Sequence, residues 1–481
     1  MFSKAKRYKT IVQLILSIFL CEIVNAQNKP DSLPAYLEIA AKNNPTVIQK
    51  FYEYLAALQK VPQVGSLPDP DLTIGYFLKP MEQVAGNQVA DIRLMQMFPW
   101  NGTLKAAKDE MSLMAKAKYE SFLDAKSTVF YDVQSTWLYL YYIEKEKHIT
   151  SENISILRMI ERLAIVKYKS SGNGNSVSSE SGTSMQNKNS SALSGSTSGM
   201  QTMLGSTASN ATNTFQSTQG ESMGSSTTGS GLADLFKIKI AIQDLQNDSA
   251  LYESQKKTIA AKFNSYLNRS EESDVYLTDS LQLSVLSLPL EALSDSISVD
   301  NPMLSMLNFE LKSIESRKKM VTKMGYPMIG IGVNYSLINK SDMSTSPMNG
   351  KDMIMPMVSV TLPIYRNKYK AMISEAELLN KAKEQEYIAT ANTLQTQYYE
   401  AVQLYLDAGR RMKLYAGQYL LISETLAILI SSFTSSGSEL NDVLLTQQQM
   451  LGYELKQEEA KVDYNTAVAL LNQLIAFSKI Q

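Results

Sequence analysis

The chain has 481 residues, a length at which a single compact domain would be unusually large. Its 46 basic and 47 acidic residues leave a net charge of −1, which argues against nucleic-acid binding because that function usually needs a basic face. The chain contains only one His and one Cys, which nearly excludes a His/Cys metal site or a His-based catalytic site. The sequence also contains no nucleophile motif and no phosphate-binding loop. We therefore expect neither an enzyme nor a bound cofactor.

Residues 1–26 are typical of a secretory signal peptide. An apolar stretch from Ile11 to Val24, too short for a comfortable membrane helix, leads to a plausible cleavage site at Val24-Asn25-Ala26. Cys21 would leave with this peptide; the alternative is a lipid anchor on Cys21, although Leu20 is bulkier than the residue that normally precedes such a cysteine. Since no later segment has about 18 consecutive apolar residues, we expect an exported protein without a transmembrane helix.

After an N-terminal segment over 27–70, the sequence predicts a first β-hairpin over 71–98. Its first strand alternates between two faces, with Leu72, Ile74, Tyr76 and Leu78 on one and Thr73, Gly75 and Phe77 on the other. In its second strand, about Val89 to Phe98, Asp91 and Arg93 lie on the face opposite Ala90, Ile92 and Leu94. Period two with one apolar and one polar or small face is the pattern of a barrel strand.

A second hairpin is predicted over 327–362, where Ile329, Ile331, Val333, Tyr335 and Leu337 alternate with small and polar residues. Pro356 predicts a bulge or local break in its last strand. Strands of about 9–11 residues are long enough for a tilted crossing of a bilayer. Aromatic residues near the strand ends would fit an interfacial girdle: Phe98, Trp100, Tyr326 and Tyr365. The alternative is a soluble sandwich, whose strands also alternate between apolar and polar residues. Four strands cannot close a barrel and open edges are not tolerated in lipid, so membrane strands here would require the chain to oligomerise. Three copies would give twelve strands, closed by cyclic symmetry.

Long helices account for most of the remaining chain. A first helical hairpin is predicted over 99–268, interrupted by a low-complexity insertion at 173–230 that we expect to be a disordered loop. A connecting segment with a helix follows over 269–326, and a second helical hairpin over 363–481. From Thr103 to Ser170 there is neither Pro nor Gly, so this helix would span on the order of 100 Å. A dimeric coiled coil is the alternative for the helices alone.

The two halves repeat each other in order. Asn44-Pro45 and Asn301-Pro302 open them, Phe98-Pro99 and Leu362-Pro363 close their strand pairs, and Ser170-Ser171-Gly172 matches Ser435-Ser436-Gly437. Such agreement predicts an internal duplication.

These residues resemble the TolC family of trimeric outer-membrane efflux channels, over about Leu33 to Phe477 without the insertion. The motifs that carry the resemblance are Ala41-Lys42-Asn43-Asn44-Pro45, Leu67-Pro68-Asp69-Pro70, Gln96-Met97-Phe98-Pro99-Trp100-Asn101-Gly102 and the Gly-then-Asp turns of the helical hairpins. The Pro-Asp-Pro and Phe-Pro-Trp pieces look most like the CusC/CzcC branch, which exports heavy-metal cations, although Asn101 replaces a second Pro and the branch's common anchor cysteine is missing.

The resemblance implies an α+β membrane protein, in which a long-helix α-barrel continues a trimeric 12-stranded transmembrane β-barrel with four strands per chain. It implies a homotrimer in the outer membrane that extends into the periplasm, where 27–70 and the 269–326 helix would lie. The function implied is a passive exit duct for toxic cations or small molecules, which docks a periplasmic adaptor and an inner-membrane pump. The alternative is the outer-membrane duct of type I protein secretion; a coiled-coil adhesin is disfavoured by the duplication.

By position, the hairpin turns would form the docking and gating end, through Ser171, Gly172, Asp234, Gly437, Glu439 and Asp442. Asp234 and Asp442 align across the repeat and could form acidic rings that favour cations, or could simply stabilise helix N-termini. Asp91 and Arg93 are expected to face the barrel lumen and to pair with each other. Methionines near the second strand pair, including Met353, Met355 and Met357, are soft ligands that suit Cu(I), but they also fill irregular gaps.

Overall fold

The computed structural model describes residues 32–172, 230–278, 280–286, 288–435 and 439–475. The expected signal peptide, Cys21, Gly437 and nearly all of the 173–230 insertion lie outside these residues. The chain divides into two units. Unit 1 comprises Met1–Thr150, Asp248–Ser423 and Gln449–Gln481, and unit 2 comprises Ser151–Asn247 and Glu424–Gln448.

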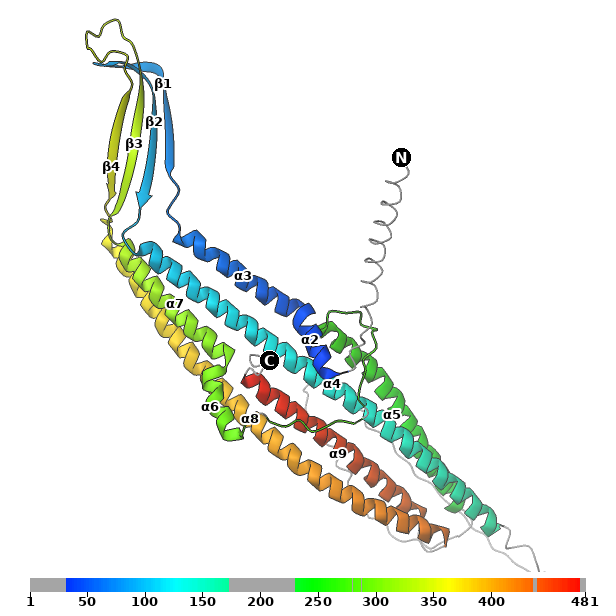
Figure 1. Ribbon diagram of the computed structural model, residues 1–481. Helices are drawn as coiled ribbons and strands as arrows, with labels where there is room; N and C mark the ends of the chain where they lie inside the picture. Colours follow the sequence, from blue (N-terminus) through cyan, green and yellow to red (C-terminus); the bar gives the residue numbers. More distant parts are fainter. Residues whose placement is uncertain (1–31, 173–229, 279, 287, 436–438, 476–481) are drawn as a thin grey trace, which may run out of the picture. The chain divides into compact units, whose positions relative to one another are not determined.

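A single antiparallel sheet in unit 1 contains four strands in the order β1-β2-β3-β4 (Figure 1). The strands are β1 (Asp71–Gln83), β2 (Gly86–Phe98), β3 (Met328–Asn339) and β4 (Met353–Thr361). The two predicted hairpins therefore pair with each other through β2 and β3, and β1 and β4 are left as the edges.

The breaks in strand register within this sheet occur at other positions than the one predicted from the sequence. The prediction of a bulge or break at Pro356 is wrong, because β4 keeps its register with β3 through the Val333–Pro356 pair. Within this chain β4 is an edge strand, the kind of strand in which a proline is tolerated. The register shifts instead between Tyr76 and Met81 of β1 and between Gln88 and Ala90 of β2, near the hairpin turn.

Among the residues that the structure describes, each half of the chain contributes four helices. The first half contains α2 (Leu33–Asn43), α3 (Pro45–Gly65), α4 (Thr103–Gly172) and α5 (Ser230–Tyr266). The second contains α6 (Leu290–Asp300), α7 (Pro302–Met324), α8 (Arg366–Thr434) and α9 (Leu440–Leu474). Each half thus follows the order short helix, longer helix, strand pair and two long helices, with the sheet strands inserted between the second and third helix (Figure 1).

The start of α3 and the start of α7 are capped in the same way. Asn44 Oδ1 accepts from Thr46 N at 2.9 Å and from Val47 N at 3.3 Å, and its Nδ2 donates to Tyr266 O at 2.9 Å. Asn301 repeats these three bonds at the same distances, with Leu474 O as the acceptor. In both, a proline occupies the first helical turn, where its missing N–H costs nothing.

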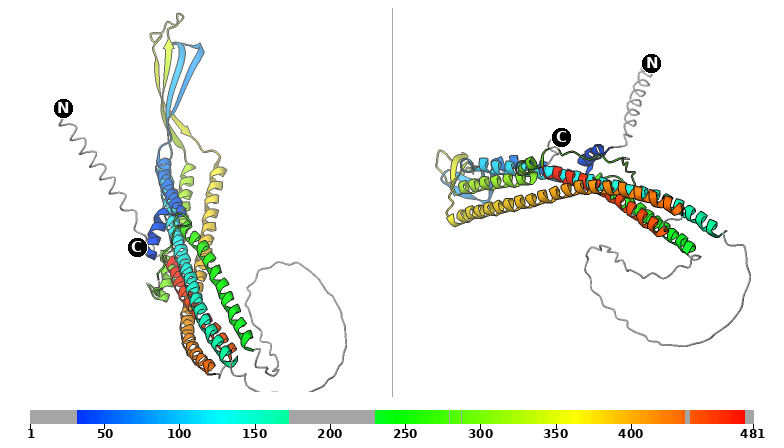
Figure 2. Two further views of the ribbon diagram at one scale, coloured as in Figure 1. Left: turned by 90° about the vertical axis from the view of Figure 1, so that its right-hand side faces the viewer. Right: turned by 90° about the horizontal axis from the view of Figure 1, so that it is seen from below.

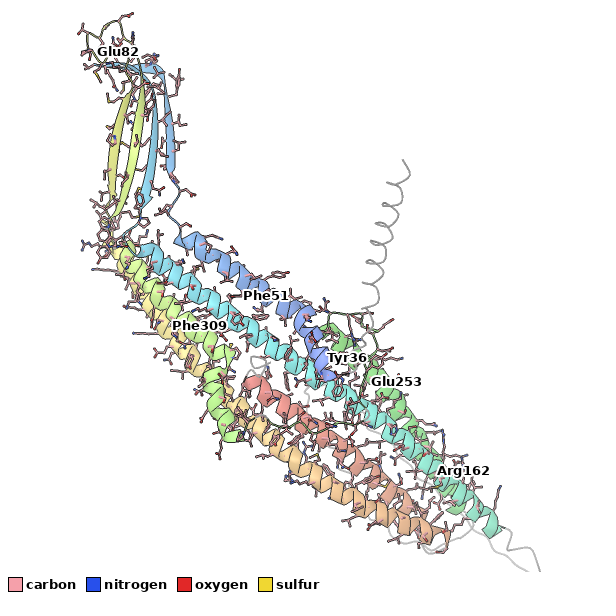
Figure 3. All side chains as sticks on the ribbon, in the orientation of Figure 1. Tyr36, Phe51, Glu82, Arg162, Glu253 and Phe309 are labelled. Atoms are coloured by element: carbon pink, nitrogen blue, oxygen red, sulfur yellow. The ribbon has the colours of Figure 1, made fainter. Side chains whose placement is uncertain are left out.

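In unit 1 the helices α3, α4, α7 and α8 contact one another in that order. Phe51 of α3 lies 5.5 Å from the ring of Phe122 on α4, and Lys116 of α4 lies 5.8 Å from the ring of Phe309 on α7 (Figure 3). Lys383 of α8 then forms an ion pair with Glu310 of α7 at 2.8 Å.

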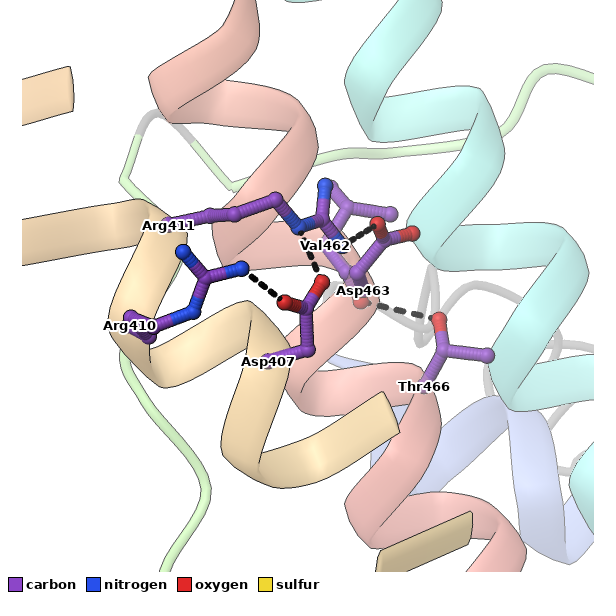
Figure 4. Close-up of polar contacts among 6 residues, drawn as sticks. All are labelled: Asp407, Arg410, Arg411, Val462, Asp463 and Thr466. Carbon is purple, nitrogen blue, oxygen red and sulfur yellow. Dashed lines mark hydrogen bonds and ion pairs between the residues drawn. The ribbon is translucent and has the colours of Figure 1, made fainter. Parts of the chain in front are cut away.

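The long helices also run as pairs (Figure 2). Lys256 of α5 forms an ion pair with Glu144 of α4 at 2.7 Å. Arg411 of α8 donates to Asp463 of α9 at 2.6 Å and to Asp407 on its own helix at 2.7 Å (Figure 4). These contacts repeat in each half the pairing of a 70- or 69-residue helix with a shorter return helix.

The main core of unit 1 is formed where α2, α4 and the end of α5 meet. Tyr36, Val133, Phe263 and Leu267 are fully buried there. Polar groups of this core hold the chain that follows α5: Tyr36 Oη accepts from Tyr276 N at 3.0 Å, and Trp137 Nε1 donates to Tyr276 O at 3.3 Å.

One described helix, α8, is long and apolar enough to cross a membrane by length and composition alone, and few residues of its apolar stretch are buried. The expectation of no transmembrane helix rested on unbroken apolar runs, whereas this apolar stretch of α8 tolerates an occasional charged residue. A core helix of a soluble protein passes the same test, so the finding is weak support for a membrane helix.

Candidate functional site

The sheet has one polar face, which is built from residues that lie directly opposite one another in the ladder. Asp91 pairs with Gly75 on β1 and with Ser336 on β3, and Arg93 pairs with Thr73 and Asn334. Directly opposed residues of an antiparallel pair point to the same side. We call this side the polar face.

Asp91 and Arg93 share the polar face, as predicted, but they form no ion pair with each other within the described residues. The predicted pairing is wrong. The carboxylate of Asp91 lies over Gly75, where a Cβ would stand 3.2 Å from its Cγ. Because glycine leaves that space open, Asp91 leans across to β1 instead of along β2 toward Arg93.

The opposite side of the sheet is apolar and exposed. On β1, Ile74 is 67% exposed and Tyr76 is 71% exposed, and on β4, Val358 is 74% exposed. Further exposed side chains of this face are Leu72, Leu94, Ile331, Val333, Ile354 and Val360. A contiguous apolar surface of this kind marks contact with lipid or protein rather than with water.

Aromatic residues gather where the strands meet the helices. Trp100, which follows β2, stacks on Tyr326, which precedes β3, with ring centroids 5.2 Å apart. The chain enters α4 through Gly102 at φ +83°, a conformation that favours glycine, and this accounts for the glycine of the Phe-Pro-Trp-Asn-Gly motif. Phe98 and Tyr365 are exposed at the same strand ends.

The second candidate region is the set of helix ends in unit 2, which we call the helix tips. Asp234 of α5 and Asn441 of α9 are linked by Lys237, whose Nζ lies 3.4 Å from Asp234 Oδ1 and 3.1 Å from Asn441 Oδ1. The lysine thus joins the starts of α5 and α9, which the sequence aligned through Asp234 and Asp442.

The two aligned aspartates differ in surroundings. Asp442 is exposed in the first turn of α9, where a negative charge is favoured by the helix dipole. Asp234 lies beyond the first turn of α5 and has Lys237 as a counter-charge. Glu439 is exposed beside the start of α9. Ser171 and Gly172 are the last two residues of α4. The side chain of Ser171 lies outside the described part of the chain.

Three polar residues of unit 2 were not predicted from the sequence. Asn153 of α4 and Gln447 of α9 are buried and hydrogen-bonded to each other. Lys167 Nζ donates to Phe433 O at 3.0 Å and lies 4.0 Å from the Phe433 ring. Polar residues at otherwise apolar positions of a long helix were the available signal for the first pair.

No group of three or more His, Cys, Asp or Glu that could hold a metal ion occurs among the residues that the structure describes. A metal site made of the usual nitrogen and carboxylate ligands therefore has no support in this part of the chain.

Comparison with solved structures identifies the architecture. The outer-membrane channel OprN matches with a TM-score of 0.68 at 10% identity, covering 92% of this chain and 89% of that one. The chain has the TolC fold. CusC, whose structures concern folding and transmembrane channel formation, matches with a TM-score of 0.68 at 12% identity over 92% of this chain and 91% of its own.

A third structure with the TolC fold is the open state of the MtrE outer-membrane channel of Neisseria gonorrhoeae, at TM-score 0.63 and 12% identity over 93% of this chain and 89% of its own. No protein-family model matches the sequence, and no curated protein matches it. The resemblance drawn from the motifs is thus confirmed at the level of the fold.

Proposed function

We propose that this protein is the outer-membrane channel of a tripartite efflux system, a passive duct that extends into the periplasm. The observation that carries the proposal is the sheet, whose strands of 13, 13, 12 and 9 residues have one polar face and one exposed apolar face. Tilted strands of about 9–11 residues cross a bilayer, and an apolar outer face with a polar inner face is the pattern of a membrane barrel.

The sheet needs other copies of the chain. β1 and β4 are open edges, and an unpaired strand edge is not tolerated in lipid. Three copies would join β4 of one chain to β1 of the next and close a barrel of about twelve strands. The outer-membrane channels with the same fold support this arrangement.

An exposed apolar stripe on α8 supports the same assembly. Tyr399, Leu406, Leu414, Leu421 and Ile428 recur every seven or eight residues and are all exposed, Leu421 by 65%. This spacing keeps them on one side of the helix. We infer that a neighbouring copy covers this stripe, which we call the α8 stripe, and that the long helices thereby form a tube.

We also infer that the two halves arose by duplication, which the matched asparagine caps support. The helix tips are then two equivalent turns, and Ser171, Gly172, Asp234, Gly437, Glu439 and Asp442 are proposed to dock an adaptor and to gate the entrance. Energy would come from an inner-membrane pump, and the duct itself would carry out no chemistry.

The test is the tolerance of a knockout strain to Cu, Ag, Zn and Co salts, bile salts and hydrophobic antibiotics. Increased sensitivity, restored by the gene, is expected for an efflux duct. Sensitivity to one or two metal ions only would assign the cation branch, and broad sensitivity a general exporter. Unchanged tolerance together with loss of a secreted protein would contradict efflux and assign the protein-secretion duct.

The channel itself is tested by inserting the purified protein into a planar lipid bilayer. Stepwise ion conductance is expected. A protein that assembles as a trimer but conducts no ions under any voltage would contradict the proposal of a duct.

A further inference from the structure

Methionines are concentrated on the polar face of the sheet. The ladder places Met95 of β2 opposite Gly332, which is itself opposite Met357 of β4. Met97 lies opposite Gly330 in the same way. Since opposed residues share a side, the methionines that point to the face carrying Asp91 and Arg93 include Met95, Met97, Met328, Met353, Met355 and Met357.

The sulfur atoms of two of them converge on one small space. The hydroxyl of Ser359 lies 3.6 Å from Met95 Sδ and 3.8 Å from Met97 Sδ. Both sulfurs also surround Gly330, where a Cβ would stand 2.6 Å from Met97 Sδ and 3.1 Å from Met95 Sδ.

Glycine at 330 and at 332 makes this convergence possible. A Cβ on Gly332 would stand 3.1 Å from Met95 Sδ, so the sulfur occupies space that any other residue would fill. Across the same glycine, Met357 lies in register with Met95 and is half-buried. Met95 and Met357 therefore lie on the same face of the sheet, on either side of a residue without a side chain.

Filling of gaps in a packed core does not explain Met353 and Met355. A core methionine is enclosed on all sides, whereas Met353 is 44% exposed and Met355 is 46% exposed on the same face. On an open polar face an apolar side chain gains little from burial. The sulfur itself, a neutral soft donor, is the feature that this face gains from methionine.

We propose that Met95, Met97 and Met357 form a thioether site for a soft monovalent cation of the Cu(I) or Ag(I) type. Thioethers prefer such cations over Mg²⁺, Ca²⁺ or Zn²⁺, and they need no deprotonation to bind them. Met353 and Met355 provide weaker donors farther along the same strand, as a conduction path requires sites that also release the ion. The inference rests on the proposed function, because the polar face becomes a lumen only in a closed barrel.

The direct experiment is a calorimetric titration of the full-length protein, assembled in detergent, with silver nitrate in chloride-free buffer. One Ag(I) bound per chain is expected. A variant with Met95→Leu, Met97→Leu and Met357→Leu should bind Ag(I) at least about 100-fold more weakly, since even loss of groups that only support metal ligands costs about 10- to 100-fold. Leucine conserves volume, so the fold should persist.

The matched control replaces three methionines that lie on helices, through Met159→Leu, Met324→Leu and Met412→Leu, and should bind Ag(I) as the original protein does. Equal weakening in both triple variants would overturn the assignment, and so would unaltered binding in the strand variant. Gly330→Ala offers a second probe that keeps every sulfur: its methyl group enters the space between Met95 and Met97 and should weaken binding.

A measurement on the unaltered protein avoids any dependence on variants. Bound Ag(I) should slow the oxidation of Met95, Met97 and Met357 by hydrogen peroxide, followed by mass spectrometry, and should leave Met159 unaffected. Equal oxidation with and without Ag(I) would overturn the site. Conductance in a lipid bilayer separates the two proposals: a conducting protein that binds no Ag(I) contradicts only this site, whereas a protein without conductance contradicts the channel.

Discussion

At the scale of single residues, two asparagines each perform two tasks through three hydrogen bonds. Asn44 and Asn301 are only 4% exposed, cap a helix with their Oδ1 and tie the end of a distant helix with their Nδ2. An amide is the side chain that suits both tasks, because it carries an acceptor and a donor together. The Asn-Pro dipeptide is therefore explained by the join that it makes between helices far apart in sequence.

Replacing Asn301 tests this account. Asn301→Ala should lower the free energy of unfolding by about 2 kcal/mol or more, because it removes the cap and leaves Leu474 O without its donor. Asn301→Ser keeps a capping acceptor for Met303 N and Leu304 N but not the donor to Leu474 O, so its loss should be smaller than that of alanine. Thermal unfolding followed by circular dichroism measures the stability of both variants. An alanine variant as stable as the original protein would contradict the role of Asn301 in joining the two helices.

The half-buried carboxyl of Glu146 on α4 gives a prediction about how stability depends on pH. Burial raises the pKa of Glu146 above its ordinary value of 4.5; the Tyr142 hydroxyl, which hydrogen-bonds to it, acts in the opposite direction, and Glu459 on α9 raises the pKa further. Tyr252 of α5 faces the same group. A raised pKa in the folded state means that the group contributes stability below about pH 4.5 and that this contribution is lost as pH rises through the folded value.

Glu146→Gln should therefore raise the melting temperature at pH 7 to 8, and the gain should disappear near pH 4.5. The control is Glu144→Gln on the same helix, which removes the ion pair with Lys256 and should not raise the melting temperature. If the melting temperature of the Glu146→Gln variant depends on pH as that of the original protein does, the raised pKa of Glu146 is not the cause of the pH dependence.

At the scale of elements, one guanidinium group provides a polar link between α8 and α9. Arg411 is 20% exposed and donates to Asp407 and to Asp463, while Arg410 donates to the other oxygen of Asp407 (Figure 4). The hydrogen bonds from Arg410 and Arg411 lower the pKa of the Asp407 carboxyl below its usual range. The planar fork of arginine suits two acceptors on different helices, which an ammonium group serves less well.

Arg411→Lys should consequently destabilise the α8–α9 pair by about 1 kcal/mol, the scale of a partly exposed ion pair. Arg410→Lys, at a side chain that is 70% exposed and bonds only within α8, is the matched control and should change little. Hydrogen exchange of the α9 amides around Asp463 is the measurement. Faster exchange in both variants, or in neither, would show that Arg411 does not couple the helices.

The elements also show what the sequence could predict and why the rest was out of reach. The four antiparallel strands and the long helices are confirmed, because period-two alternation and uninterrupted helical spacing are local signals. The charge pairing of Asp91 failed because its partner space belongs to Gly75 on another strand. Lys237, Asn153 and the sulfur cluster at Gly330 were missed for the same reason, since each depends on strand register or helix pairing that no local pattern encodes.

At the scale of the whole molecule, the chain leaves unsatisfied surfaces of two kinds. The sheet has unpaired edges at β1 and β4, and α8 exposes an apolar stripe. Backbone groups at an edge and apolar side chains in water are both costly to leave uncovered. Rotation about one axis can cover both with copies of the same chain, which is how cyclic symmetry satisfies complementary surfaces.

The assembly prediction follows from the α8 stripe. Leu406→Glu combined with Leu414→Glu should convert the proposed trimer into monomers, because burial of each leucine contributes about 1.5–3 kcal/mol and a closed trimer would bury every changed position three times. Val299→Glu on α6, at a side chain that is 75% exposed, is the control and should leave the mass unchanged. Native mass spectrometry in detergent measures the species directly. A trimer that survives the double substitution would mean that the α8 stripe is covered by something other than another copy, and the closure of the sheet would then need a different partner.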